Sequence, residues 1–388
     1  MKVSIVGAGN AGCFTALHTA WYTRKNTEVE VELIYNPDIP AERVGQATVL
    51  DPPRLLYGSM GFDWSRNTIH ATPKTGILYE GWGKVNEKVS HPFPASSLGM
   101  HFCPSETQRA ILDSGWFKVI EDDVDPKDVD ADYVFDCRGK PEDLSDYDKL
   151  NNPINSVILG KPNWDVTTCL WSRHVATPDG WTFVIPVDKD SPSHDGCVGY
   201  LYNSDITSKE DAEKNFLDLF DVDVTRHLSF NNYVAKNPVV DDRIFLQGNR
   251  LFFLEPLEAS ALQTYLEWAR YCYDAIIIKS HSLKKASNMI KDYITKVQNY
   301  VLWHYKFGSK YDTPFWDHAK KMTLPWSFKP DSEFEHILDI VKKQTIDDLH
   351  NQSYGGMVPD NYSYAYLNPI SFKRWYDGMS RQSTLKML

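Results

Sequence analysis

The N-terminal stretch that decides the fold reads Val3-Ser4-Ile5-Val6-Gly7-Ala8-Gly9-Asn10-Ala11-Gly12. Its first four residues predict a short apolar strand, and a helical pattern follows to about Arg24. Gly7 allows a tight turn, Gly9 lets the backbone approach a pyrophosphate, and Gly12 lets the helix pack closely on the strand. The stretch therefore predicts an α/β nucleotide fold that binds a dinucleotide. The alternative is a glycine-rich turn that binds no ligand.

The second predicted strand departs from this fingerprint. Such a strand is expected to end in an acidic residue that bonds the adenosine ribose. Here it ends Ile34-Tyr35-Asn36, so Asn36 or Glu42 would have to take that role. This departure argues against a tightly held NAD.

A third apolar strand, residues 131–136, ends at Asp136 and leads into Cys137-Arg138-Gly139. In a doubly wound sheet the carboxyl ends of the strands line the ligand crevice. We therefore expect Asp136 and Gly139 to lie near the cofactor. The long interval between the second and third strands, residues 37–118, is rich in aromatic residues and proline and predicts an inserted, partly β segment.

Composition narrows the class of protein. The chain has 388 residues, which predicts two lobes rather than one compact core. Its net charge of −11 argues against nucleic acid or an anionic membrane surface as a partner. The six cysteines lie far apart with no CxxC pair, so we predict neither a metal site nor a disulfide framework. With no long apolar run and no signal-peptide pattern, we expect a cytoplasmic protein.

The stretch Glu255-Pro256-Leu257-Glu258-Ala259-Ser260 places two acidic residues around Pro-Leu after an apolar run. Pro256 ends the preceding strand, and a helix is predicted from Ala259 to Tyr273. Glu258 thus lies close to a helix N-terminus, where the helix dipole favours the carboxylate and burial opposes it. Such a carboxylate can serve as a base. The alternative is a first-turn residue that only satisfies free backbone N–H groups.

Lys74 follows Pro73 at the start of the predicted strand Thr75 to Trp82. A lysine in this position is usually a charge on an exposed sheet edge. If it points instead into an aromatic cavity, loss of water lowers its pKa and makes it a proton donor or a nucleophile. Both interpretations remain open from position alone.

The rest of the chain shows two further patterns. Large residues alternate around Trp181, which is more typical of sheet core than of a substrate site. Helical spacing returns at residues 262–280 and 284–306. The tail, residues 355–388, is rich in Tyr, Pro and Gly, and we expect it to wrap the surface.

Taken in order, these stretches resemble the flavin-dependent halogenases of the tryptophan-halogenase type. The matching stretches are residues 7–12, Val44-Gly45-Gln46-Ala47-Thr48, Lys74 to Trp82, Gly180 to Pro186, Glu255 to Glu258, and His304-Tyr305 with Asp312-Thr313-Pro314-Phe315-Trp316. Each stretch alone is modest, but the ordered set is specific and spans residues 1 to about 316.

The resemblance implies FAD as the dinucleotide, delivered as FADH2 by a separate flavin reductase. With O2 and a halide ion, the reduced flavin would generate hypohalous acid, which would travel through an interior tunnel to an electron-rich aromatic substrate. Lys74 matches the family's essential lysine, acting through a hydrogen bond or a haloamine, and Glu258 matches its active-site glutamate. Backbone N–H groups of Ser260 and Ala261 would hold the halide.

The predicted contacts divide into two sets. The cofactor contacts are Gly7, Gly9, Asn10, Ala11, Gly12, Ala47, Thr48, Asp136, Gly139 and Gly248. The candidates for the substrate site are Trp82, His91, Phe93 and His101.

The chain also departs from the family pattern. Phe183 replaces the second tryptophan of Trp-x-Trp-x-Ile-Pro, and Gln46 stands where the family prefers Glu. Ala259-Ser260-Ala261 replaces the usual Ser-Thr-Gly, which could reshape the halide pocket. The chain is also short for an enzyme that encloses free tryptophan, so we expect a more open site.

The expected architecture is α/β, with an FAD-binding, glutathione-reductase-like nucleotide fold, an inserted β-rich substrate lobe and a helical C-terminal region. The flavin lobe is predicted at 1–60, 118–150 and 240–275, the β-rich lobe at 61–117 and 151–239, and the helical region at 276–388. Two other functions stay open, a flavin-dependent aromatic monooxygenase and a non-catalytic flavin-fold binding protein. The sequence leaves open the substrate, halide, reductase and oligomeric state.

Overall fold

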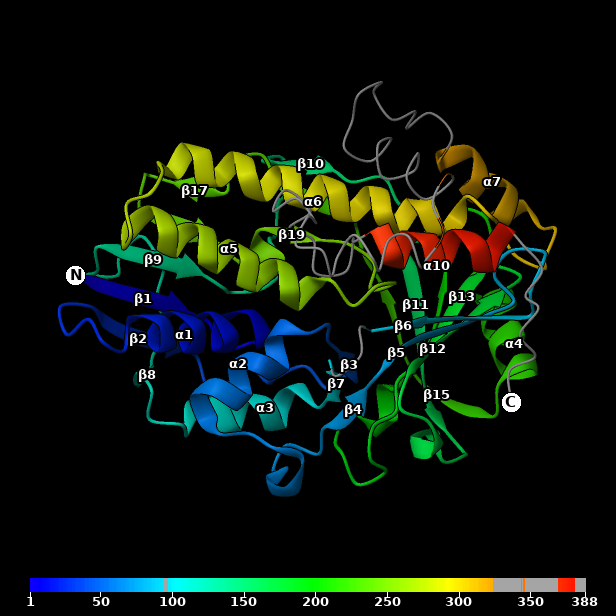
Figure 1. The fold of residues 1–388 in the computed structure, drawn as a ribbon, viewed down its shortest axis with the longest axis horizontal. Helices are drawn as coiled ribbons and strands as arrows, with labels where there is room; N and C mark the ends of the chain where they lie inside the picture. Colours follow the sequence, from blue (N-terminus) through cyan, green and yellow to red (C-terminus); the bar gives the residue numbers. More distant parts are fainter. Residues whose placement is uncertain (94–96, 324–342, 344, 346–368, 381–388) are drawn as a thin grey trace.

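A computed structural model of the chain describes residues 1–93, 97–323, 343, 345 and 369–380. Figure 1 shows two sheet regions side by side, with the helices α5 (Ala261–Ile276) and α6 (Leu283–Tyr305) running along one side of the molecule. The two helices pack against each other.

The six-stranded sheet contains the N-terminal strand. Its strands lie in the order β17 (Val239–Val240), β18 (Ile244–Leu246), β9 (Tyr133–Asp136), β1 (Lys2–Val6), β2 (Glu30–Tyr35) and β8 (Lys118–Glu121). All neighbours pair parallel except β17 with β18. Among the parallel strands, chain order runs outward from β1 through β2 to β8 and, on the other side, through β9 to β18, so it reverses between β1 and β9, where open α/β sheets bind their ligands. The predicted α/β nucleotide fold is confirmed.

Helices pack on this sheet because their apolar side chains are buried together with those of its strands. Val3 and Ile5 of β1 are fully buried, as the apolar run of the first strand predicts. The helix α1 (Asn10–Thr23) follows β1 and packs against α2 (Asp51–Met60), α3 (Pro104–Leu112) and α5. Three helices thus hold α1 in place beside the sheet.

The seven-stranded sheet forms the second region. Its strands lie in the order β15 (Val222–Ser229), β11 (Ser156–Pro162), β14 (Val198–Tyr202), β13 (Gly180–Val184), β12 (Ser172–Thr177), β5 (Gly76–Glu80) and β6 (Lys88–Pro92). Only β12 and β5 pair parallel. Trp181 and Phe183 on β13 are buried, which agrees with the interpretation of this stripe as sheet core.

Two three-stranded sheets and several short helices connect these regions. One sheet orders β3 (Gln46–Ala47), β7 (Gly99–Phe102) and β4 (Thr72–Lys74), and the other orders β10 (Tyr147–Lys149), β16 (Tyr233–Ala235) and β19 (Phe252–Phe253). This part of the chain also contains the helix α4 (Lys209–Leu219) and the 3₁₀ turns Trp64–Arg66, Val166–Thr168, His194–Gly196 and Gly248–Arg250. β4 and β5 follow one another and belong to different sheets, so Lys74 lies where two sheets meet.

Two helices follow α6 among the described residues. The first, α7 (Pro314–Thr323), packs on α6, and the second, α10 (Pro369–Ser380), packs on β6. Trp375 of α10 is fully buried, so this part of the tail does not merely wrap the surface as expected. The rest of that tail lies outside the described residues. No helix in the described part of the chain is long and apolar enough to cross a membrane.

The helix after Glu258 begins later than predicted. It starts at Ala261, because Ala259 has a φ of +52°, in the left-handed region, and cannot belong to a right-handed helix. The preceding strand is also shorter than expected, since β19 spans only Phe252–Phe253. The division of the chain into three lobes stays a prediction.

Candidate active site

The loop between β1 and α1 is shaped by glycines that admit no side chain. Gly7 has a φ of +105°, and a Cβ added there would lie 2.7 Å from the carbonyl oxygen of Cys137. A Cβ on Gly12 would lie 1.8 Å from the carbonyl oxygen of Gly7. Both positions therefore need glycine so that helix and strand can approach this closely.

Gly9, in contrast, faces open space. A Cβ added at Gly9 would meet no heavy atom within 4 Å. Gly9 is the N-cap of α1, no side chain caps the helix, and its first turn carries no acidic residue. The first backbone N–H groups of α1, from Asn10 onward, therefore lack a side-chain acceptor and favour an anionic group. This arrangement fits the pyrophosphate of a dinucleotide.

Three other predicted cofactor contacts, Gly248, Gly139 and Asp136, differ in their surroundings. Gly248 packs against α1, because a Cβ added there would lie 2.5 Å from the Cβ of Ala11. Gly139 has a φ of +89° and open space beside it. Asp136 is buried and accepts hydrogen bonds from Arg138, with Nε and Nη2 each at 3.0 Å. Gly9 and Gly139 thus have open space beside them, Gly248 lies in close contact with α1, and Asp136 is already engaged by an arginine.

The segment before α2 offers fewer side-chain contacts than predicted. Thr48 is buried, and its hydroxyl donates to Val49 O at 2.7 Å and accepts from Met100 N at 3.0 Å. Ala47 is half-buried on β3. Glu42, a candidate for the missing ribose acceptor, bonds Arg226 at 3.2 Å. The ribose contact therefore has no obvious side chain prepared for it in this segment.

Lys74 ends β4 and is fully buried. Its Nζ has no hydrogen-bond partner among the described residues and lies 5.5 Å from the ring centre of Phe93. Burial lowers the pKa of Lys74 to about 8, while the negative charge of Glu258 acts in the opposite direction. The alternative of an exposed edge lysine is wrong, because Lys74 points into the protein where the two sheets meet.

The neighbours of Lys74 are kept neutral. Burial lowers the pKa of His101 and of His174 well below the usual value, and the positive charge of Lys74 adds to this in both. His101 is held by Ser172 Oγ, 3.0 Å from Nε2, and by Thr72 Oγ1, 3.1 Å from Nδ1. Lys74 is therefore the cation of this side of the site.

Glu258 is buried as deeply as Lys74 but has several donors. The Tyr79 hydroxyl donates to Oε1, His304 Nε2 lies 2.6 Å from the same oxygen, and His91 Nδ1 lies 3.8 Å from it. Burial opposes ionisation of Glu258. The charge and hydrogen bond of His304, supported by His91, nevertheless hold its pKa well below the usual value. Glu258 is therefore a carboxylate across the physiological range of pH.

The backbone after Glu258 turns sharply into α5. Ala259 takes a left-handed conformation, which is unusual for a residue with a side chain and typical of functional turns. Ser260 is the N-cap of α5, and neither its side chain nor an acidic residue in the first turn caps the helix. The N–H groups of Ser260 and Ala261 lie at the positive end of this helix, which fits a halide ion.

Glu255 occupies a different setting three residues earlier. Its Oε2 accepts hydrogen bonds from Tyr305 Oη at 2.8 Å and from Trp181 Nε1 at 3.2 Å. Burial raises the pKa of Glu255 to about 7, although these hydrogen bonds oppose the rise. The hydrogen-bond donors to Glu255 are uncharged. The pKa of Glu255 is therefore raised, whereas the pKa of Glu258 is lowered.

Aromatic rings enclose the Glu258 side of the site. Trp375 of α10 lies with its ring centre 4.2 Å from that of Tyr79 and 4.3 Å from that of His304. Trp82 is buried in the same cluster, and its Nε1 donates to His174 O at 3.1 Å. Trp82, like His101, is thus packed and hydrogen-bonded inside the protein, which favours a structural role over substrate contact. His91 and Phe93 are the two candidates that face the charged pair.

Sequence reasoning missed four residues of the site, namely Tyr79, His174, His304 and Trp375. Tyr79 lay inside a quoted stretch and shares a face of β5 with Ile77, as the alternation of a strand predicts. His304 was quoted without a role. Trp375 comes from a tail that gave no periodic signal strong enough to predict a buried helix.

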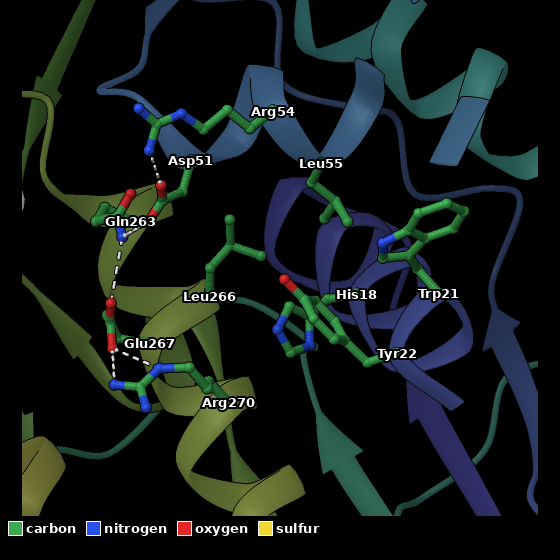
Figure 2. A pocket seen from close by; sticks show the side chains of 10 residues that line it. All are labelled: His18, Trp21, Tyr22, Asp51, Arg54, Leu55, Gln263, Leu266, Glu267 and Arg270. Carbon is green, nitrogen blue, oxygen red and sulfur yellow. Dashed lines mark hydrogen bonds and ion pairs between the residues drawn. The ribbon is translucent and has the colours of Figure 1, made fainter. Parts of the chain in front are cut away.

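A separate cavity lies between α1, α2 and α5 (Figure 2). His18 and Leu266 face each other across it, and Asp51, Arg54, Glu267 and Arg270 form ion pairs at its rim. Its volume of about 180 Å³ is below the range of about 300–1,000 Å³ typical of ligand pockets. It contains neither Lys74 nor Glu258 and is not the site of the predicted chemistry.

The family model of the tryptophan halogenases matches residues 2–113 and 122–354 of this chain. The chain belongs to the tryptophan halogenase family. As a member of this family it is an enzyme and a flavoprotein oxidoreductase, which confirms the family predicted from the ordered motifs.

Solved halogenase structures share its fold. BrvH, a flavin-dependent halogenase from Brevundimonas sp. BAL3, superposes with a TM-score of 0.74 at 18% identity, covering 99% of this chain and 91% of its own. A flavin-dependent halogenase from Xanthomonas campestris gives 0.77 at 16%, covering 98% and 88%. The tryptophan 6-halogenase SttH from Streptomyces toxytricini gives 0.73 at 18%, covering 99% and 92%.

Proposed function

We propose that the protein halogenates an electron-rich aromatic substrate, with Lys74 and Glu258 acting on hypohalous acid made from FADH2, O2 and a halide. One observation carries the proposal. Lys74 is a buried amine with no hydrogen-bond partner in the described part of the chain, and its pKa responds to Glu258. A buried cation without a partner is costly, and such a site is typical of a group that waits for a ligand.

The residues of the nucleotide fold support FAD as the cofactor. The open space at Gly9 and the uncapped start of α1 would receive the pyrophosphate, with Gly139 leaving room beside it. When bound, reduced FAD would supply two electrons that reduce O2 to the peroxide level, which is the oxidant that converts a halide to hypohalous acid. The amides of Ser260 and Ala261 would hold the halide at the start of α5.

Lys74 and Glu258 can then assist the transfer of the halogen from hypohalous acid to the aromatic ring. The aromatic carbon attacks the halogen, the carbon–halogen bond forms and the oxygen–halogen bond breaks. Lys74, as the ammonium, donates a proton to the leaving hydroxide, which becomes water, and Glu258 accepts the ring proton. Return of one proton from Glu258 to Lys74 restores the starting state. The buried aromatic rings around Tyr79 exclude water, which strengthens both interactions.

Mass spectrometry tests this function directly. The protein is incubated with pooled electron-rich aromatics, FAD, NADH and a generic flavin reductase, with chloride, bromide or iodide in separate reactions. We expect a mass change that matches one halogen in place of hydrogen. A gain of one oxygen would favour the aromatic monooxygenase instead, and a product formed equally by Lys74→Ala would remove the proposed role of Lys74.

Cofactor binding has a test of its own. The variant Gly9→Ala adds a methyl group where the structure has open space, so the fold should persist while the phosphates are pushed away. We expect FAD binding to weaken about tenfold, the equivalent of one charge-assisted hydrogen bond. Equilibrium dialysis measures this, with Gly58→Ala on α2 as the control. Unchanged FAD binding in Gly9→Ala would contradict the placement of the pyrophosphate at α1.

A further inference from the structure

His304 stands between two hydrogen-bond acceptors. It lies on the last turn of α6 and is fully buried. Its Nδ1 is 2.7 Å from the backbone oxygen of Tyr300, and its Nε2 is 2.6 Å from Glu258 Oε1. A carbonyl oxygen and a carboxylate can only accept, so both ring nitrogens must carry a hydrogen. His304 is therefore an imidazolium when Glu258 is ionised.

The surroundings leave Glu258 as the counter-ion of this imidazolium. The groups that face Glu258 are Tyr79 from β5, His91 from β6, His304 from α6 and Lys74 from β4. From β12, His174 faces the same region and is kept neutral by burial. The rings of Tyr300 and Trp375 pack on His304 and add no charge.

We infer that His304 is a positioning residue for Glu258, an imidazolium that keeps the carboxylate ionised and fixes one of its oxygens. This role rests on the proposed function, in which Glu258 accepts the ring proton. His304 passes no proton onward, since its second nitrogen meets a backbone carbonyl that cannot take one. Its contribution is the orientation and charge of Glu258 rather than proton transfer.

The role predicts a specific pattern among variants. His304→Phe keeps a ring in the cluster and removes both donors, so we expect the halogenation rate to fall by roughly 10²-fold, as for loss of the base itself. His304→Gln restores a neutral donor and should recover part of the rate. Adding His304→Phe to Glu258→Gln should cost no more than about threefold further, because both act through one group. Additive losses would overturn the inference.

The pH profile separates positioning from mere packing. Without the imidazolium, burial is left as the main influence on Glu258, so its pKa rises in His304→Phe. The acid limb of the halogenation rate should therefore move to higher pH, while His18→Gln, a buried histidine on α1, should leave the limb in place. A lower rate with an unmoved acid limb would mean that His304 only fills space.

A second readout needs no activity and so distinguishes failure of this inference from failure of the proposed function. Nitrogen-15 NMR of the cofactor-free protein, with labelled histidine, should show one buried imidazolium at neutral pH. Its signal is assigned by its loss in His304→Gln. In Glu258→Gln that histidine should become a neutral imidazole. A neutral His304 in the unsubstituted protein would refute the inference whether or not halogenation occurs.

Discussion

The two charged ends of the site differ in how they are supported. Glu258 is hydrogen-bonded by Tyr79 and His304, whereas Lys74 has no hydrogen-bond partner among the described residues. Both side chains are almost fully buried, so exposure does not explain the difference. The carboxylate is fixed in advance, while the amine keeps its hydrogen-bonding capacity for a ligand. Preorganisation on one side and an unused donor on the other are what transfer of a small electrophile requires.

The largest decrease in the halogenation rate should follow the loss of the Lys74 amine. Lys74→Met replaces the amine by an apolar chain of similar length, so we expect halogenation to fall roughly 10³-fold or more while the fold is kept. Oxidation of reduced flavin by O2 should continue and release free hypohalous acid or peroxide. Product mass spectrometry and a peroxide assay measure both, with the exposed Lys88→Met on β6 as the control. Retained halogenation would remove Lys74 from the reaction.

Loss of the Glu258 carboxylate should lower the halogenation rate less than loss of the Lys74 amine. Glu258→Gln keeps the shape of the side chain and its contact with Tyr79 but cannot accept the ring proton, so we expect a decrease of roughly 10²-fold in the halogenation rate. Single-turnover product formation measures the step without the reductase. An unchanged halogenation rate would mean that Glu258 serves only as a structural residue of the turn before α5.

The pH dependence separates the two possible roles of Lys74. Burial lowers its pKa to about 8, so the ammonium predominates below that value and the neutral amine above it. If Lys74 acts as a hydrogen-bond donor, as we expect, the rate should fall about tenfold per pH unit above 8. A rate that rises through the same interval would instead indicate a haloamine. Stopped-flow or quenched reactions with added hypohalous acid isolate this step from flavin chemistry.

The smallest effect should come from the neighbouring carboxyl group. Burial raises the pKa of Glu255 to about 7, and uncharged groups hold it. If cationic support is what distinguishes Glu258, then Glu255→Gln should change the halogenation rate by less than about threefold. The same product assay at pH 7 measures it. A loss comparable to that of Glu258→Gln would show that Glu255 takes part in the proton transfers.

The sequence predicted the backbone geometry of the glycine loop better than the contacts in the interior. The glycine loop could be predicted because Gly7, Gly9 and Gly12 act through local backbone geometry at fixed spacing. Lys74 and Glu258 were identified through the resemblance, but spacing alone left each with an alternative role. Burial excluded an exposed-edge position for Lys74, and burial depends on which sheets meet.

The partners of Glu258 could not have been derived from local pattern. Tyr79 and His304 come from β5 and α6, and their contacts with Glu258 depend on packing between distant segments. Trp375 is farther still, in a tail whose composition suggested a surface strap. The left-handed Ala259 also escaped prediction, because alanine rarely takes that conformation and no sequence signal marks it.

The burial of Trp375 against Tyr79 has a consequence for how the molecule is made. β4 and β5 leave the ribosome about 300 residues before α10. Until α6 and α10 have been synthesised and packed, Glu258 lacks its donor His304, and Tyr79 lacks the ring of Trp375 that packs on it. The nucleotide loop, built from adjacent residues, can form early, since local contacts close quickly. The surroundings of Glu258 are therefore completed late in folding, after α6 and α10 have been made.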